Sequence, residues 1–189
     1  MNPRPRQLWL VRHGPTHARE MIGWTDRPAD LSDHAALARL AAELPDVPVI
    51  SSDLIRARAT ADALQGRRPR LPDDPRLREI HFGHWEARRH AEVDAEDPQT
   101  LRAFWEQAGD TRAPGGESWN AMAARVHAGL DALPAAAIIV CHFGPILAAV
   151  QRALGCDVQT VFAHRIDPLS LTELHHDGQW QLRRINHIP

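Results

Sequence analysis

The sequence predicts an α/β layered fold built on a mostly parallel sheet. Short apolar runs with β-branched or aromatic residues, typical of buried strands, alternate with segments whose apolar residues recur at helical spacing. Near the C-terminus, two alternating stretches flank Asp177-Gly178, a strong hairpin signal that makes the predicted sheet mixed. A chain of 189 residues is long enough to bury a hydrophobic core, and we expect a single domain over residues 1–189.

The first strand and helix are predicted at 7–11 and 31–44. Residues 7–11 read QLWLV, a short apolar run of the kind found in buried strands. In 31–44 three leucines recur at helical spacing, and either Ser32 or Asp33 is suited to cap the start of the helix.

The second strand and helix are predicted at 47–52 and 54–66. Residues 47–52 read VPVISS, and prolines before the run and polar residues after it bound the expected strand. We expect the helix that follows to be capped by Asp53 or Ser52 and stopped by Gly66.

The middle of the chain is less regular. A third short strand is a candidate at 69–71, and the polar stretch 83–116 predicts one or two helices lying over the sheet. Within that stretch, residues of about 84–115 are predicted to form a short lid-like insert. Trp85 and Trp105 are candidates to cover a ligand there.

The last third of the chain is strongly patterned. Residues 117–133 place apolar side chains on one helical face, and AAIIVC at 136–141 predicts a buried strand. A turn and a helix are expected over 142–155, and the hairpin over 169–185.

Composition excludes several classes of function. A net charge of −2 provides no basic stripe for nucleic acid, and no segment approaches the ~20 apolar residues of a membrane span. The two cysteines, Cys141 and Cys156, make no disulfide framework, so we expect a cytoplasmic protein. All 22 basic residues are arginine, which excludes lysine Schiff bases and P-loop lysines. The sequence does not indicate an oligomeric state.

Polar residues follow three of the predicted strands where each strand ends. In folds of this class ligands bind at the carboxyl ends of the strands, where the chain turns into helices. The residues at these positions are Arg12 and His13, then Ser52 and Asp53 with Arg56 shortly after, and finally His142, Phe143 and Gly144. Two histidines and two arginines are therefore expected on one rim of the sheet.

Four stretches in order resemble the histidine phosphatase superfamily, also called the phosphoglycerate-mutase-like family. They are LVRHGPT at 10–16, SSDLIRARATA at 51–61, LREIHFGHWE at 77–86 and IIVCHFGPI at 138–146. Together they span nearly the whole chain. The resemblance implies a three-layer αβα sandwich with a mostly parallel mixed central sheet.

The resemblance also implies a role for each site residue. His13 would attack phosphorus and form a phosphohistidine, while Glu79 would protonate the leaving group. Phosphate would be bound by Arg12, Arg56 and Phe143, and by His142 acting as a third donor if it is protonated. No metal or cofactor is implied. Pro15 departs from the family, which usually has an acidic residue or glutamine after RHG.

Within the superfamily the chain is similar to the α-ribazole phosphatase branch. The similarity lies in LREIHFGHWEARRH, FWEQ, PGGESWNAMAARV and AHRIDPLSLTEL. It implies hydrolysis of a small-molecule phosphate ester, with α-ribazole 5′-phosphate as the candidate. Arg88 and Arg89 face either a second anionic group or solvent.

Three alternatives remain beside this interpretation. Mutases of the family carry a longer insertion than 84–115, and phosphatases of protein phosphohistidine are typically more compact. A non-catalytic module that binds a phospholigand needs neither a nucleophile such as His13 nor an acid such as Glu79. Histidine pairs suggest a metal site, yet no Cys/His spacing of a closed zinc site is present.

Overall fold

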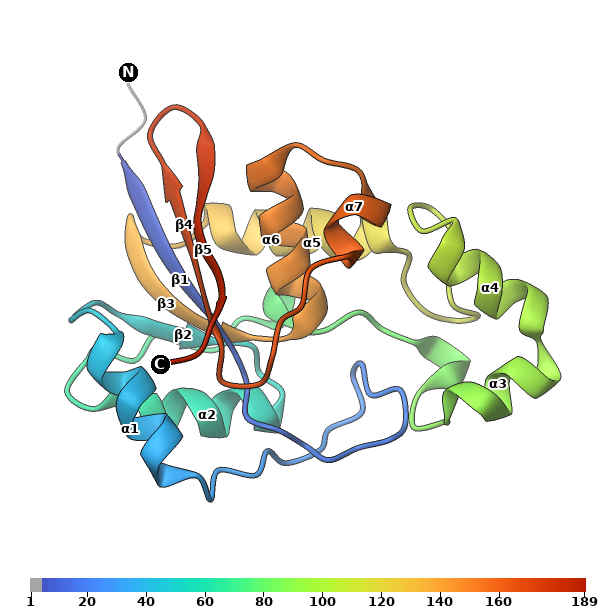
Figure 1. The fold of residues 1–189 in the computed structure, drawn as a ribbon, viewed down its shortest axis with the longest axis horizontal. Helices are drawn as coiled ribbons and strands as arrows, with labels where there is room; N and C mark the ends of the chain where they lie inside the picture. Colours follow the sequence, from blue (N-terminus) through green and yellow to red (C-terminus); the bar gives the residue numbers. More distant parts are fainter. Residues whose placement is uncertain (1–4) are drawn as a thin grey trace.

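The computed structural model describes residues 5–189, and within them five strands form one sheet in the order β2-β3-β1-β4-β5 (Figure 1). The strands are β1 (Arg6–Arg12), β2 (Val49–Ser51), β3 (Ala136–Cys141), β4 (Leu171–His176) and β5 (Trp180–His187). Strands β2 and β1 both pair with β3 in parallel, whereas β4 runs antiparallel to β1 and to β5. The predicted mixed sheet and the closing hairpin are confirmed.

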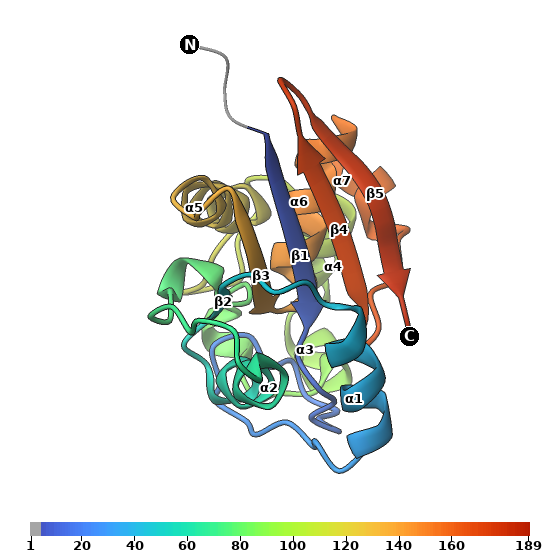
Figure 2. The ribbon, with the colours of Figure 1, turned by 90° about the vertical axis from the view of Figure 1, so that its left-hand side faces the viewer.

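Helices cover both faces of this sheet, which gives the expected three layers. On one face α1 (His34–Glu43) and α2 (Ile55–Gln65) pack against Trp9 and Val11. On the other face α5 (Trp119–Asp131) and α6 (Phe143–Leu154) pack against Leu8 and Leu10. In Figure 2 the strands lie side by side, with α6 behind them. Since neighbouring residues of β1 point to opposite faces, burial of both faces explains its unbroken apolar run.

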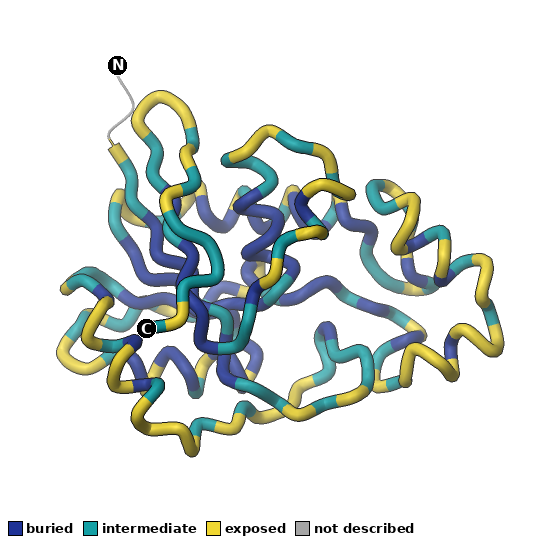
Figure 3. Tube along the Cα trace, viewed as in Figure 1, coloured by how far each residue is buried: buried dark blue, intermediate teal, exposed yellow. Residues whose placement is uncertain are grey.

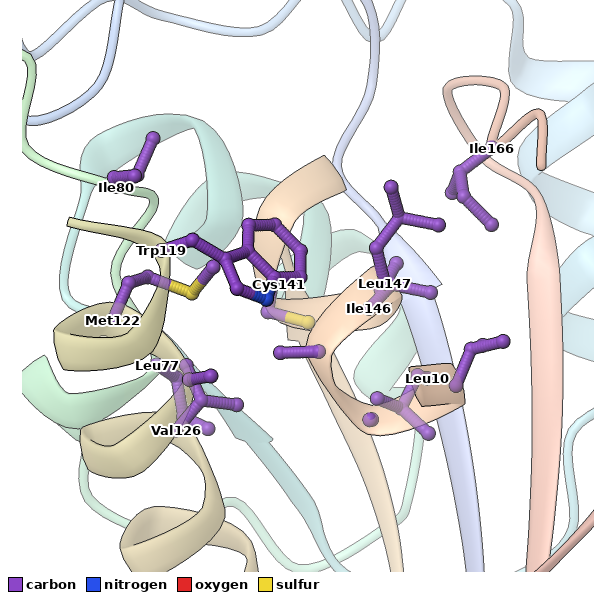
Figure 4. Close-up of a cluster of buried hydrophobic side chains, with 14 of the residues drawn as sticks. Leu10, Leu77, Ile80, Trp119, Met122, Val126, Cys141, Ile146, Leu147 and Ile166 are labelled. Atoms are coloured by element: carbon purple, nitrogen blue, oxygen red, sulfur yellow. The ribbon is translucent and has the colours of Figure 1, made fainter. Parts of the chain in front are cut away.

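The core is densest between the sheet and α5 and α6. Trp119 and Met122 from α5 lie against Cys141 of β3 and Ile146 of α6 (Figure 4). Figure 3 shows the buried trace concentrated in the central strands and these two helices, while the segment that contains α3 and α4 is mostly exposed. This packing holds the central strands in place, and the carboxyl ends of these strands carry the candidate site.

The segment 84–115 contains α3 (His90–Glu96) and α4 (Pro98–Glu106). The expectation that its helices lie over the sheet is wrong, because they project to one side of it, beyond α5 and α7 (Figure 1). Both sheet faces are already covered by other helices. The apolar side of α4 instead packs Phe104 against Phe82 and Trp85, with ring centroids 6.1 and 5.4 Å apart. That the segment acts as a lid stays a prediction.

Several boundaries differ from the expected ones. Helix α1 begins at His34, with the carboxylate of Asp33 accepting the N–H of Ala36. Helix α2 begins at Ile55, whose N–H is accepted by the carboxylate of Asp26 at 2.8 Å, while Asp53 pairs with Arg78. Asp53 does not cap α2, because its carboxylate is engaged by the N–H groups of the Arg78 guanidinium and is not available to the first N–H groups of the helix.

The shortest elements of the fold have no clear pattern in the sequence. The candidate strand at 69–71 amounts to a single bridge between Val49 and Arg70. Helix α7 (Val158–Phe162) and the 3₁₀ helices η1 (Pro75–Leu77) and η2 (Gly83–Trp85) are too short to show a period. Among residues 5–189, none of the helices has both the length and the apolar character that crossing a membrane requires.

Candidate active site

The carboxyl ends of three neighbouring parallel strands meet at one edge of the sheet. The N–H of His13 bonds to the carbonyl of Cys141 at 3.1 Å, and the N–H of Ser52 bonds to that of Val140 at 3.1 Å. These bonds continue the ladders beyond β1 and β2. As a result the rings of His13 and His142 lie with their centroids 5.0 Å apart. The histidines that the sequence placed on one rim are brought together.

His13 is buried and presents one ring nitrogen without a proton. Its Nδ1 lies 2.7 Å from the carbonyl oxygen of Gly14. Because a carbonyl only accepts, Nδ1 must carry the proton, and Nε2 keeps its lone pair. Burial, followed by the charge of Arg56, lowers the pKa of His13 to about 3. The neutral, nucleophilic form of the imidazole is thus the one present near neutral pH.

His142 is fully buried and has both ring nitrogens engaged. The Nε–H of Arg56 donates to Nδ1 at 3.2 Å, so Nε2 carries the proton and donates to Oγ of Ser52 at 2.8 Å. Burial, followed by the proximity of the titrating ring of His13 and the charge of Arg56, holds the pKa of His142 well below its usual range. These contacts leave His142 a single N–H, on Nε2, and that it serves as a third donor to phosphate stays a prediction.

The two predicted arginines differ in how many of their N–H groups are already hydrogen-bonded within the protein. Nη1 of Arg12 donates to the carbonyl of Ile166 at 2.6 Å, and its guanidinium lies 5.5 Å over the ring of Phe143. Its buried Nε has no hydrogen-bond partner within residues 5–189. Burial lowers the pKa of Arg12, an effect opposed by the charges of Glu79 and Asp167. Arg12 therefore retains donors for an anion.

Arg56 is buried beneath the rim. Besides its bond to His142, it donates to the carbonyl of Thr25 at 2.9 Å and to that of Gly23 at 2.6 Å. Three of its five N–H groups are thus committed, one on each nitrogen, and one remains on each terminal nitrogen. Arg56 both contributes positive charge and fixes the orientation of His142.

The carboxylate of Glu79 lies at the N-terminus of α6. It accepts the N–H of Gly144 at 3.1 and 3.2 Å and that of Ile80 at 2.9 Å. A Cβ at position 144 would lie 2.3 Å from Oε1 of Glu79, closer than real Cβ contacts come. Glycine is therefore required at 144 for the carboxylate to lie where it does.

A clamp that the sequence analysis missed holds the backbone of Glu79. Nη2 of Arg125 and Nε1 of Trp24 both donate to the Glu79 carbonyl, at 2.7 and 2.8 Å. Arg125 is oriented in turn by the carboxylate of Glu117, at 2.7 Å to each oxygen. These partners are 46 residues or more from Glu79 or lie in irregular segments, so no local pattern signals them.

A second missed residue, Glu86, organises the loop under Arg56. Its carboxylate accepts the N–H groups of Gly23, Trp24 and Thr25 at 3.1, 2.8 and 2.9 Å, together with the Thr25 hydroxyl. Burial alone would raise the pKa of Glu86, but these hydrogen bonds outweigh it and lower the pKa. An ionised Glu86 keeps the loop in the conformation whose carbonyls hold Arg56.

Threonine and serine hydroxyls complete the support. Oγ1 of Thr60 accepts the N–H of Gly14 at 3.0 Å and donates to the carbonyl of Arg56 at 2.7 Å, tying the turn after His13 to α2. Oγ of Ser52 accepts hydrogen bonds from the N–H of Leu54 at 3.2 Å and from Nε2–H of His142 at 2.8 Å. These hydroxyl hydrogen bonds fix the positions of His13 and His142 relative to Arg56.

Next to Glu79 an apolar pocket of about 70 Å³ opens between the rim and the 84–115 segment. Phe143 and Trp105 line it, whereas Trp85 is buried in the core and does not. Arg88 pairs with Glu96 at 2.6 Å.

Pro15 contributes its carbonyl, which accepts the N–H of Asp30 at 2.6 Å. Among residues 5–189, no group of three or more His, Cys, Asp or Glu side chains is placed to hold a metal ion.

The assembled groups suit a phosphoryl group. Two guanidinium groups supply positive charge and directional N–H donors, a neutral imidazole supplies a lone pair, and a carboxyl group is within the same cluster. That His13, Glu79 and His142 perform catalysis, and that Arg12, Arg56 and Phe143 bind substrate, stays a prediction from the geometry.

Comparison with known proteins shows the family of the chain. The profile described as Histidine phosphatase superfamily (branch 1) matches residues 8–188. The adenosylcobalamin/alpha-ribazole phosphatase of Salmonella typhimurium strain LT2 is 30% identical over 173 residues, covering 85% of this chain and 86% of that protein. A Proteus mirabilis protein named "Probable phosphoglycerate mutase GpmB" is 33% identical over 165 residues, covering 82% and 74%.

Solved structures of other proteins are similar to this chain over nearly its whole length. A mycobacterial glucosyl-3-phosphoglycerate phosphatase superimposes with a TM-score of 0.82 at 29% identity, covering 97% of this chain and 100% of that one. The alpha-ribazole phosphatase of Shigella flexneri shares the fold, with a TM-score of 0.82 at 24% identity and 96% coverage of both chains. With its two facing histidines and a profile match over nearly its whole length, the chain belongs to the histidine phosphatase superfamily.

Proposed function

We propose that this protein is a metal-independent phosphomonoesterase that acts through a phosphohistidine on a small-molecule phosphate ester. The observation that carries the proposal is the state of His13. Its ring is neutral, its Nε2 is free of a proton, and it lies beside Arg12 and Arg56 on a rigid strand end. Binding alone would need none of these properties, which argues against a non-catalytic module.

The first step transfers the phosphoryl group to the protein. The Nε2 lone pair of His13 forms a bond to phosphorus while the bond from phosphorus to the ester oxygen breaks. Glu79 gives its proton to that oxygen, so the alcohol leaves neutral. Arg12 and Arg56 stabilise the charge on the non-bridging oxygens, and the single N–H of His142 is a further donor once it turns from Ser52.

The second step restores the protein. Water forms a bond to phosphorus, the bond between phosphorus and Nε2 of His13 breaks, and Glu79 takes back a proton from the water. The products are inorganic phosphate and the free enzyme. Each step needs Glu79 in the opposite protonation state, and its two hydrogen-bonded oxygens hold it in place for both.

For the substrate, α-ribazole 5′-phosphate is our first candidate, because the Salmonella relative carries that activity in its name and aligns over most of both chains. A phosphoglycerate-type mutase is the second candidate, because relatives named for that reaction reach similar identity. The short 84–115 segment favours hydrolysis, since a mutase must keep water from the phosphohistidine.

The test is a panel of α-ribazole phosphate, 3-phosphoglycerate and nucleotides, scored for released phosphate and for isomerised product. Stopping the reaction on a ³²P-labelled substrate should trap acid-labile label on the protein. His13→Ala should lose both the label and turnover, while His17→Ala, at an exposed histidine nearby, should keep both. Label that persists in His13→Ala would refute the assignment, and isomerised 3-phosphoglycerate would favour the mutase.

A further inference from the structure

The pocket beside Glu79 is walled by aromatic rings from five separate parts of the chain. The rings belong to Phe82, Phe104, Trp105, Trp119, Phe143 and Phe162. They pack on one another, with Trp105 in edge contact with Phe104 at 5.0 Å and Trp119 in edge contact with Phe162 at 4.8 Å. Such mutually supported rings keep the pocket open and its walls in place.

The lining of the pocket is apolar except for one carboxylate. Of the described residues that line it, Glu79 alone is charged. The polar Nε1 of Trp119 donates to Gln151 at 2.8 Å, which leaves the face of the ring for the pocket. A group that enters it therefore meets apolar surface and one carboxylate. None of the described residues that line it is an arginine, so the lining offers no cationic partner to an anionic group.

The pocket adjoins the rim at the two residues they share. Glu79 is the predicted proton donor to the ester oxygen, and Phe143 lies 5.5 Å beneath the guanidinium of Arg12. With phosphate held by Arg12 and Arg56, the alcohol part of the ester must leave past Glu79. That path leads into the aromatic pocket.

Trp105 supports the same interpretation, because the residue is 36% exposed although its side chain is large and apolar. Exposed aromatic surface at the mouth of a pocket is typical of a binding site. The volume of about 70 Å³ is roughly half that of a 150 Å³ cavity that takes up benzene. The pocket therefore admits the edge of one ring, with the remainder lying against Trp105.

From these observations we infer that the aromatic pocket binds the leaving group, and that it selects phosphate monoesters whose alcohol carries an uncharged aromatic or similarly apolar ring. The inference rests on the proposed phosphatase function and narrows it. It disfavours phosphoglycerates, whose carboxylate would face Glu79 and apolar walls. It is compatible with a ribazole, whose base is an uncharged planar ring.

The test compares benzyl phosphate with ethyl phosphate, whose alcohol leaving groups have similar acidity. We expect benzyl phosphate to have a kcat/KM roughly tenfold higher, as for the removal of on the order of 60 Å² of apolar surface from water, with most of the difference in KM. Ala108→Leu places a larger side chain in the pocket and should bring the ratio of the two kcat/KM values close to one. Gln107→Leu adds the same side chain next to the pocket and should leave the ratio as it is.

Binding without turnover separates the two proposals. Calorimetry with benzylphosphonate and ethylphosphonate should show the same roughly tenfold preference in the wild type and its loss in Ala108→Leu. Equal affinity for the two phosphonates, or equal kcat/KM for the two esters, would overturn the pocket assignment alone. A preserved binding preference without phosphate release from either ester would overturn the phosphatase and leave the pocket as a ligand site.

Discussion

Replacing Glu79 by glutamine removes one titratable proton and little else. Oε1 of Glu79 accepts the N–H of Ile80 at 2.9 Å and that of Gly144 at 3.1 Å. The amide oxygen of Glu79→Gln, placed at Oε1, has the same two lone pairs and accepts both bonds, so that only the longer 3.2 Å contact between Oε2 and the N–H of Gly144 is lost. We therefore expect the free energy of unfolding to change by less than about 1 kcal/mol, so that any kinetic effect reports on proton transfer.

The kinetic effect should depend on the leaving group. An alkoxide cannot leave without a proton, so Glu79→Gln should slow an alkyl phosphate by ~10²–10⁴-fold. That range corresponds to about 3–5 kcal/mol of lost transition-state stabilisation. Nitrophenolate leaves unprotonated, and p-nitrophenyl phosphate should be slowed far less. The decisive quantity is the ratio of the two losses.

The assay measures phosphate released from benzyl phosphate and nitrophenolate released from p-nitrophenyl phosphate at the same pH. Glu106→Gln, at an exposed carboxylate of α4, is the control and should leave both rates unchanged. Equal slowing of both substrates by Glu79→Gln would refute the role of Glu79 as the acid. It would leave Glu79 as a residue that only holds the N-terminus of α6.

Other predictions follow from the same contacts. Gly144→Ala puts a Cβ 2.3 Å from Oε1 of Glu79 and must displace the carboxylate, so circular dichroism should stay native while alkyl phosphate turnover falls more than nitrophenyl phosphate turnover; equal losses would contradict the placement. Because burial lowers the pKa of His13 to about 3 and that of His142 well below its usual value, the unfolded chain binds more protons below pH 6.5 and stability must fall as pH falls. Between pH 7 and 5 His13 should account for a loss of roughly 2 kcal/mol in urea unfolding, which His13→Asn should remove; a flat profile in the wild type would contradict the burial of the two histidines as neutral rings. Chelation with EDTA should leave turnover unchanged, because arginines supply the charge a metal would supply elsewhere; loss of activity restored by zinc or magnesium would overturn the mechanism.

The local pattern of the chain was enough to predict the elements that are long or doubly buried. An apolar run such as that of β3 has few alternatives to a buried strand, and Asp177-Gly178 determines where the hairpin turns. The parallel order of the strands then predicts that Arg12, His13 and His142 meet at one edge. This part of the candidate site follows from topology alone.

Only the tertiary structure decided how these groups are held and charged. Arg125 and Trp24 reach the carbonyl of Glu79 from distant parts of the chain, and Glu86 reaches the loop under Arg56 across more than 60 residues. Such partners leave no periodic or capping signature in the sequence, because each depends on where unrelated segments come to lie.

The protonation states were decided in the same way. His13 and His142 are the same residue type in the sequence as the exposed His17, yet burial beside Arg56 keeps both neutral. Asp53 lies between a strand and a helix, where a helix-capping residue is expected, but its carboxylate forms an ion pair with Arg78 instead. Residue type and order determine which chemistry is present, whereas desolvation and long-range hydrogen bonds, which exist only in the folded chain, determine the state in which it acts.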